Sequence, residues 1–435
     1  MTTYEQIGRL AQEQEKDLIA TRRDFHKYAE TGWFEMRTSS LIARRLTALG
    51  YEVLTGEQVC LKEARMGVPD AEALEAHYEK AKAWGADPEF LPATKGGMTG
   101  VIGILRRGEG PTVALRFDID ALGVNESTEP DHKPTAQGFA SVNPGAMHAC
   151  GHDSHAAVGL GVAKVLMDIA DQLHGTVKLI FQPAEEGVRG AKSIVEKGHL
   201  DDVDFFIGSH VSSQTAAPGM ALSAGSYGSL ATCKYDVTYR GLAAHAGAYP
   251  QKGKNALLAA SAAVLNLYAI PRHGDGASRI NVGTLHAGSG RNVIADEAKM
   301  ELEVRGATTA INNHMCQAAE RILKSCADMY GCEMEMKLMG AADSLTSDRV
   351  LCDRINRVCR EHMGLPVHPE MILSFGSEDI SYMMNRVQAR GGQATFMRIL
   401  TPFAGPAHNR KFDIGEDVLT TGVKVFCAAV YDIMQ

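Results

Sequence analysis

Residues Met147–His155, with the sequence Met-His-Ala-Cys-Gly-His-Asp-Ser-His, concentrate side chains that could do chemistry. The stretch holds three histidines, one cysteine and one aspartate. Thiolate and imidazole are favoured ligands of zinc and similar divalent ions, and Gly151 lets the backbone turn so that Cys150 and His152 can face one ion. Two alternatives stay open: a turn with a chance cluster of polar residues, or Cys150 as a nucleophile activated by His152. The density of donors favours half of a metal site.

Further donors follow predicted strands. Buried strands are predicted over 112–117, 176–182 and 205–209, and they lead into Asp118 and Asp120, Glu185 and Glu186, and His210. In a parallel sheet the site lies beyond the carboxyl ends of the strands. We therefore expect these five side chains to share one site with Cys150 and His152.

A metal centre built from these residues would hold more than one ion. Cys150, His152, Glu186, His210 and His408 together offer one thiolate, one carboxylate and three imidazoles, more than one four-coordinate ion requires. Two ions bridged by one ligand would use them all, and such pairs hold a water and a substrate oxygen together. His408 is the weakest of the five, because a lone loop histidine is more often structural. It is included because it follows a predicted strand.

The acidic pairs are predicted to divide two roles, metal binding and proton transfer, between neighbouring carboxylates. Glu185 and Glu186 are expected to diverge at a strand end, so that one binds metal while the other takes a proton. Two solvated loop carboxylates are the alternative. Asp120 suits a role in orienting a ligand imidazole, whereas a structural hydrogen bond is an equal alternative for Asp118.

The elements that must position these residues predict an α/β fold. A chain of 435 residues exceeds the usual size of one domain, so two domains are expected. Alternating strands and helices predict a mostly parallel sheet with helices on both faces. The first 50 residues are predicted to form two helices, and Asp153 or Ser154 is expected to cap the helix that follows Cys150.

A second domain is predicted to interrupt the first. Residues 231–339 show the order β-α-β-β-α-β, which is typical of a ferredoxin-like α+β domain. The catalytic domain would then comprise residues 1–230 and 340–435. A charged, alanine-rich helical insertion is expected at about 58–97, between two strands.

Composition narrows the function classes. A net charge of -8 gives no support to nucleic-acid binding, which favours concentrated positive charge. No apolar run approaches the roughly 20 residues that span a membrane, and the first residues lack a basic-then-apolar signal region. Nine cysteines without paired spacing are typical of small core residues in a reducing compartment. We therefore expect a cytoplasmic protein with no nucleic-acid or membrane partner.

Four motifs carry a family resemblance over nearly the whole chain. They are Met147-His-Ala-Cys-Gly-His-Asp153, Phe181-Gln-Pro-Ala-Glu-Glu-Gly187, Ala243-Ala-His-Ala-Gly247 and Gly376-Ser-Glu-Asp379. On these the chain resembles the metallo-amidohydrolases that group with aminoacylase, carboxypeptidase G and the plant auxin-conjugate hydrolases. The subgroup acting on p-aminobenzoyl-glutamate is similar in further stretches, namely Arg22-Arg-Asp-Phe-His26, the insertion, Gly288-Ser-Gly-Arg-Asn-Val293 and His408-Asn-Arg-Lys-Phe-Asp413. One departure is Pro406-Ala407, where the fuller pattern often has two histidines.

The resemblance implies a metal-dependent exopeptidase-like fold with two divalent ions, zinc or manganese foremost and cobalt or nickel also suited. It implies ligation by Cys150, His152, Glu186, His210 and His408, with Glu185 as general base. It further implies that the small domain forms a dimer contact and lends His245 to the site, and that Asn292 and Arg291 bind substrate. A glutamate product would need a cationic clamp, which Arg291 or Arg305 could supply.

These implications amount to an enzyme that cleaves the amide bond of a small-molecule N-acyl amino acid, with p-aminobenzoyl-glutamate as the preferred substrate. The dimer partner would be an identical chain or a related B subunit. Two alternatives remain: an aminoacylase or dipeptidase with another acyl group, and a non-catalytic paralogue that supports a partner subunit. The paralogue would be expected to lack ligands, and none is missing here.

Overall fold

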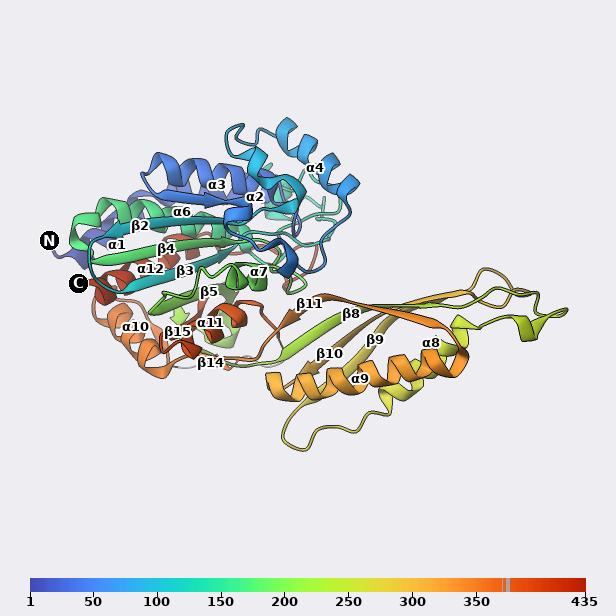
Figure 1. Ribbon diagram of the computed structural model, residues 1–435. Helices are drawn as coiled ribbons and strands as arrows, with labels where there is room; N and C mark the ends of the chain where they lie inside the picture. Colours follow the sequence, from blue (N-terminus) through green and yellow to red (C-terminus); the bar gives the residue numbers. More distant parts are fainter. Residues whose placement is uncertain (370, 373–375) are drawn as a thin grey trace. The chain divides into compact units, whose positions relative to one another are not determined.

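The computed structural model of the protein describes residues 1–369, 371–372 and 376–435, and it divides into two compact units (Figure 1). Unit 1 comprises Met1–Tyr227, the described part of Thr346–Leu373, and Asp379–Gln435. Unit 2 comprises Gly228–Leu345 and the described part of Ser374–Glu378. The chain therefore leaves unit 1, builds unit 2 and returns.

Unit 1 is built on an eight-stranded sheet in the order β1-β2-β4-β3-β5-β15-β6-β13. Its strands are β1 (Glu52–Thr55), β2 (Val101–Arg107), β3 (Thr112–Asp118), β4 (Gly175–Gln182), β5 (Phe205–Ser213), β6 (Leu222–Ser223), β13 (Val367–His368) and β15 (Gln393–Thr401). The central strands β4, β3, β5 and β15 are parallel to one another. These four strands are almost wholly buried, as expected where helices cover both faces of a sheet.

Helices cover both faces of this sheet, so the predicted α/β fold class is confirmed. One face carries α6 and α12 with α1, α2 and α10 packed around them, and the other carries α7 and α11. The helices of unit 1 are α1 (Thr3–Glu13), α2 (Glu15–Lys27), α3 (Met36–Ala48), α4 (Ala71–Ala83), α5 (Lys133–Ala136), α6 (His152–Asp168), α7 (Ala191–Glu196), α10 (Arg349–Glu361), α11 (Ile380–Ala389) and α12 (Val418–Met434).

Two local predictions were wrong, and one helix was missed. The first 50 residues form three helices, not two, because the chain breaks briefly at Gln14 between α1 and α2. Helix α6 begins at His152, so neither Asp153 nor Ser154 is its cap; Gly151, at φ 89°, takes that position. Helix α11 was not predicted.

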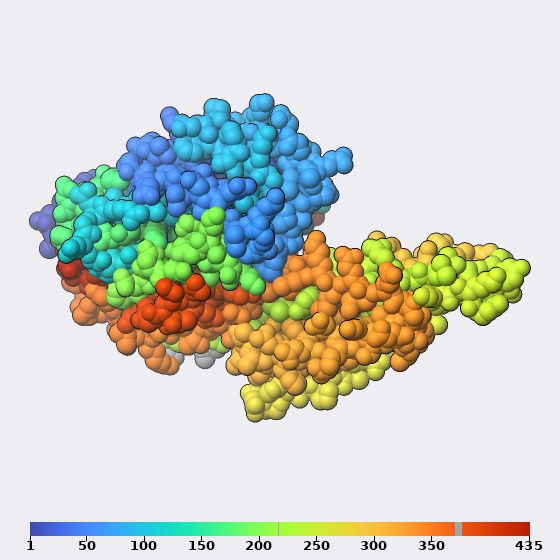
Figure 2. Space-filling model, viewed as in Figure 1, coloured from blue at the N-terminus to red at the C-terminus, as the bar shows by residue number. Residues whose placement is uncertain are grey.

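The insertion between β1 and β2 consists of α4 and short 3-10 turns. It packs on α3 through a small separate apolar cluster, in which Leu74 and Leu91 contact Met36 of α3. The indole N–H of Trp33 donates to the carbonyl of Met66 at 2.8 Å. Helix α4 contacts α3, and the insertion, in lighter blue, lies on the surface of unit 1 (Figure 2).

Unit 2 has the element order β-α-β-β-α-β. Its elements are β8 (Ala231–Arg240), α8 (Ala256–Tyr268), β9 (Ser278–Ala287), β10 (Glu297–Gly306), α9 (Thr309–Tyr330) and β11 (Glu333–Ala342). The sheet is antiparallel in the order β11-β8-β10-β9, and α8 and α9 pack on one of its faces. This is the ferredoxin-like topology.

Short strands β7 (Ser226–Ser229), β12 (Leu345–Thr346) and β14 (Met371–Ile372) lie where the chain passes between the units. Within the described ranges, none of the helices combines the length and the apolar character that a membrane crossing demands.

Candidate metal centre

Cys150, His152 and His210 come together at the carboxyl edge of the sheet of unit 1. Cys150 precedes α6, His152 is its first residue, and His210 comes from β5. Cys150 Sγ lies 3.3 Å from His210 Nε2, and one donor atom from each of the three residues lies within 4.8 Å of the others. His210 lies inside β5, not at its end as predicted, because β15 pairs with β5 as far as Ser213.

Glu185 and Glu186 both point at this cluster. Glu185 Oε2 and Glu186 Oε1 each lie 4.0 Å from His152 Nε2. The expected divergence of the two carboxylates is therefore not observed. Their turn is not an extended strand: Ala184 and Val188 have left-handed backbones with φ of 50° and 60°.

Buried groups hold this strained turn in place. The Ala184 N–H donates to Glu35 Oε1 at 2.7 Å, and the Glu186 N–H donates to Asp120 Oδ2 at 2.9 Å. Arg189 Nε donates to the Glu186 carbonyl at 2.8 Å. Burial, together with the charge of Asp120, raises the pKa of Glu35 to about 8. A non-glycine left-handed residue costs about 1–3 kcal/mol, and such strain persists only where the surroundings enforce it.

Asp120 also orients His152. His152 Nδ1 lies 2.9 Å from the Asp120 carbonyl and 3.2 Å from Asp120 Oδ1. Binding of Nδ1 by a carboxylate or carbonyl leaves Nε2 as the metal-binding atom, the arrangement usual for metal-bound histidine. The geometry is the one expected of Asp120 from the sequence.

The environment of His152 Nε2 tests whether a cation fits. This atom is buried and has no hydrogen-bond partner among the described residues. Its neighbours Asp118 Oδ2, Glu185 Oε2 and Glu186 Oε1 lie at 3.7, 4.0 and 4.0 Å, too far for hydrogen bonds. Atoms that each bind one ion at about 2.0–2.3 Å lie about 3–4 Å apart. The residues present therefore fit a divalent ion.

Burial and charge in the cluster support the same fit. Burial raises the pKa of the Cys150 thiol, and the carboxylates of Glu186 and Glu185 raise it further although His152 lowers it. A divalent cation bound here would offset the nearby carboxylate charges and lower the pKa of the Cys150 thiol, which favours the thiolate.

His408 reaches the cluster from the loop after β15. Its Nε2 lies 3.8 Å from Glu186 Oε1, and its side chain is 55 % exposed. The His408 backbone is left-handed, with φ 65°, and its N–H donates to the Ala149 carbonyl at 2.7 Å. One donor atom each of His408, Cys150 and Glu186 lies within 4.8 Å of the others. The structure thus brings together all five predicted ligands.

No role was assigned to His155 from the sequence, although the structure places it beside the cluster. Its Nδ1 is hydrogen-bonded to Asp118, and its Nε2 accepts the Val211 N–H at 3.0 Å. Asp118 also accepts from Arg116 Nη1 at 2.5 Å. Burial would raise the pKa of Asp118, but the charges of Arg116 and His152 hold it well below its usual value. The signal was present, because His155 lies three residues after His152 on one helical face.

The candidates of unit 2 form a second group. His245 is exposed, and its Nδ1 accepts the N–H groups of Gly247 and Ala248 at 3.2 and 3.1 Å. Its Nε2 therefore carries the proton of the neutral ring and can donate outward. The Ala246 N–H donates to the Asn292 carbonyl at 3.0 Å, so His245 and Asn292 occupy neighbouring turns.

The two candidate arginines lie apart within unit 2. Arg291 is exposed beside Asn292, in the turn before β10, whereas Arg305 lies near the other end of that strand. A strand of this length separates them by about 25 Å. Arg305 is paired with Glu303 at 3.0 Å. No residue of unit 2 belongs to the metal-ligand clusters found among the described residues.

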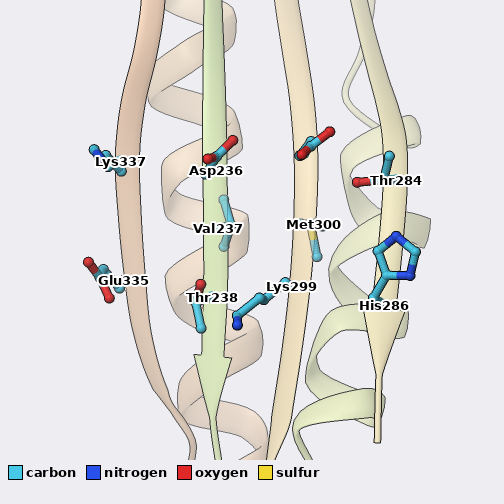
Figure 3. A pocket seen from close by; sticks show the side chains of 10 residues that line it. Asp236, Val237, Thr238, Thr284, His286, Lys299, Met300, Glu335 and Lys337 are labelled. Atoms are coloured by element: carbon cyan, nitrogen blue, oxygen red, sulfur yellow. The ribbon is translucent and has the colours of Figure 1, made fainter. Parts of the chain in front are cut away.

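A hollow of about 510 Å³ lies on the face of the unit 2 sheet that α8 and α9 leave uncovered (Figure 3). Asp236 and Thr238 of β8, Lys299 of β10 and His286 of β9 line it, with the helices behind the sheet. None of the residues that line it is a predicted site residue.

Residues 114–432 match the model of Peptidase family M20/M25/M40. The chain belongs to this family. It is 44 % identical over 410 residues to the indole-3-acetyl-aspartic acid hydrolase of Enterobacter agglomerans, which covers 94 % of each chain. It is also 44 % identical over 405 residues to the A subunit of the p-aminobenzoyl-glutamate hydrolase of Escherichia coli, covering 93 % of this chain and 92 % of the relative.

A solved relative has the same fold. The aminobenzoyl-glutamate utilization protein of Klebsiella pneumoniae superposes with a TM-score of 0.85 at 37 % identity, covering 98 % of both chains. These matches confirm the predicted family and the predicted enzyme class, a metal-dependent amide hydrolase.

Proposed function

We propose that this enzyme hydrolyses the amide bond of an N-acylated acidic amino acid, with p-aminobenzoyl-glutamate as the preferred substrate. The observation that carries the proposal is the convergence of Glu185 and Glu186 on the buried Nε2 of His152, beside Cys150 and His210. Glu185 lies at the centre but is not among the five proposed ligands, so it is available as a base. The relatives named for hydrolysis of acylated aspartate and glutamate support the substrate class.

Cys150, His152, Glu186, His210 and His408 would hold two divalent ions. The mixture of thiolate, imidazole and carboxylate suits zinc or manganese, and cobalt or nickel would also bind. When bound, such a pair polarises the amide carbonyl and lowers the pKa of water. Asp120 keeps His152 oriented through its carbonyl and Oδ1.

Glu185 is the general base of the proposal. Its carboxylate is mostly buried and lies at the cluster, so it can take a proton from the attacking water and pass it to the leaving amine. The turn at Ala184 and Val188 directs Glu185 and Glu186 toward one point, which lets neighbouring residues serve the base and the ligand roles.

His245 would stabilise the developing oxyanion in the site of a partner subunit. The side chain of His245 is exposed, and its Nδ1 accepts two backbone N–H groups, so the ring is preorganised to donate through Nε2. Asn292 and Arg291, in the neighbouring turn, would bind the substrate carboxylates. Arg305 remains the weaker clamp because it is engaged by Glu303.

Residues 231–339 would then form a dimerisation and lid domain, and residues 1–230 and 340–435 the catalytic domain. Exposed apolar side chains on α8 and on the edge strand β9 support an intermolecular contact there; they are Leu257, Leu258, Leu265, Tyr268 and Leu285. The partner would be an identical chain or a related B subunit, as the name of the Escherichia coli relative suggests. All nine cysteines are unpaired, which supports the cytoplasm as the compartment.

A substrate panel with metal analysis tests the proposal. The purified protein should release glutamate from p-aminobenzoyl-glutamate and contain up to two divalent ions per chain. Indole-3-acetyl-aspartate is the second candidate substrate, because that hydrolase is equally identical to this chain. Glu185→Gln is the inactive control. Full metal occupancy with no activity on either substrate would overturn the substrate assignment.

A further inference from the structure

Arg22 on α2 is wholly buried, yet it lies far from the cluster in sequence and belongs to none of the ligand sets. Its guanidinium meets three carboxylates. Nε donates to Asp153 Oδ2 at 2.8 Å, Nη2 to Asp413 Oδ1 at 2.5 Å, and Nη1 to Glu416 Oε1 at 3.4 Å. Each of its three nitrogens is thus directed at a different carboxylate.

Two of these carboxylates belong to segments that carry candidate ligands. Asp153 directly follows His152 in the first turn of α6. Asp413 lies in the loop after β15 that also carries His408, and its carbonyl accepts the Ala404 N–H at 2.9 Å. Arg22 therefore joins the start of α6 to the His408 loop.

The chemistry of the guanidinium explains why an arginine occupies this position. A planar fork with fixed donor directions sets the relative places of the groups it binds, whereas an ammonium acts as a point charge. Removing one partner of a buried ion pair is strongly destabilising, because it leaves the other charge buried and uncompensated. The side chain of His408 is 55 % exposed, and its backbone N–H donates to the Ala149 carbonyl, so the position of this loop relative to the start of α6 sets where the imidazole lies.

We propose that Arg22 is a positioning residue that fixes the His408 loop against the start of α6 and thereby sets the affinity of the centre for the ion that His408 binds. This inference rests on the proposed metal centre. Loss of an outer partner of a metal ligand typically weakens metal binding by about 10–100-fold, and a similar loss is expected here.

The experiment measures zinc binding to the metal-stripped full chain by calorimetry, with the bound stoichiometry checked by metal analysis. Arg22→Lys keeps the charge and removes the fork, and Asp413→Asn keeps the shape of the partner. Either variant should lose about 10–100-fold in affinity for one of two ions. His408→Ala should lower the affinity for the same ion. The double variant with Arg22→Lys should show little further loss of affinity.

Arg354→Lys is the matched control. Arg354 binds Asp432 and joins α10 to α12 in the same unit, away from the ligands. It should lower the thermal midpoint without changing zinc affinity. If Arg22→Lys fails to fold, Asp413→Asn decides the question.

The outcomes separate the two claims. A folded Arg22→Lys or Asp413→Asn protein that binds both ions with wild-type affinity would overturn the inference alone. An equal loss of affinity for both ions, in proportion to a loss of thermal stability, would also overturn it. A wild-type chain that binds no divalent ion would overturn the proposed centre and the inference with it.

Discussion

The candidate residues of unit 1 and of unit 2 differ in how they are held. In unit 1, His152 is wholly buried, Asp120 binds its Nδ1, and Asp120 also binds the Glu186 backbone. In unit 2, His245, Asn292 and Arg291 are exposed on turns, and the partners found for the His245 ring are N–H groups of its own turn. Burial enforces geometry, whereas exposure leaves a side chain available to a second surface.

The difference indicates two kinds of function. The candidate metal ligands of unit 1 lie together within one chain and are held by the groups around them. The exposed residues of unit 2 would act only when another surface meets them. Perturbing each region should therefore give different defects, and the following predictions use this difference.

The largest effect is expected from Glu185→Gln, which removes the proposed base from the buried region. The variant should keep its metal and lose roughly 10²–10⁴ in kcat. Glu186→Gln should lose metal as well, and Cys150→Ala should lower bound metal in the same way. Kinetics and metal analysis of the three variants measure this. Equal metal content in Glu185→Gln and Glu186→Gln would show that the assigned roles are wrong.

His245→Ala tests the exposed region. Loss of an oxyanion donor typically costs about 3–4 kcal/mol of transition-state stabilisation, or roughly 10²–10³ in kcat. Metal content should not change, since no metal-ligand cluster in the described ranges includes His245. Mixing inactive His245→Ala and Glu185→Gln chains should restore activity if the site is shared between two chains. Absence of recovery in verified mixed dimers would place His245 elsewhere.

The buried region should also show a pH-dependent stability from His26. Burial lowers the pKa of His26, but hydrogen bonds to Asp153 and Glu126 outweigh it and raise the pKa from 6.5 to about 9, against the nearby charge of Arg22. Since the folded pKa is raised, this stabilisation is complete below pH 6.5 and is lost as pH rises toward 9. It amounts to about 3 kcal/mol at about 1.36 kcal/mol per unit.

His26→Gln provides the comparison, because it removes the titration while retaining a donor. The free energy of unfolding of the wild type should fall more steeply than that of the variant between pH 6.5 and 9, as measured by denaturant titration. Parallel curves for the two proteins would show that His26 does not titrate in this range.

The smallest effect separates the two arginines. Arg291→Ala should raise KM for p-aminobenzoyl-glutamate by about tenfold or more, as expected for a lost charged hydrogen bond of about 1.5–3 kcal/mol. Arg305→Ala should change KM less, because Glu303 already engages that side chain. Initial-rate kinetics at constant metal content decide between them. A larger rise for Arg305→Ala would reverse the assignment of the carboxylate clamp.

Local sequence determined the elements and the chemical inventory. Apolar runs that lead to Asp118, Glu185 and His210 identified three neighbouring strands of one sheet, because parallel strands bring their carboxyl ends together. Cys150 and His152, separated by one glycine, indicated the turn that would carry two of the ligands. The donor types alone were enough to indicate a metal centre.

Tertiary structure alone decided how those donors face one another. Glu185 and Glu186 converge because Glu35, 149 positions from Ala184, holds Ala184 in a left-handed conformation that an isolated strand end would not adopt. Gly151 moves the start of α6 to His152, and Arg22 meets Asp413 across 391 positions. Such contacts leave no periodic trace in the sequence, because they depend on buried charge pairing between segments that only the folded chain brings together.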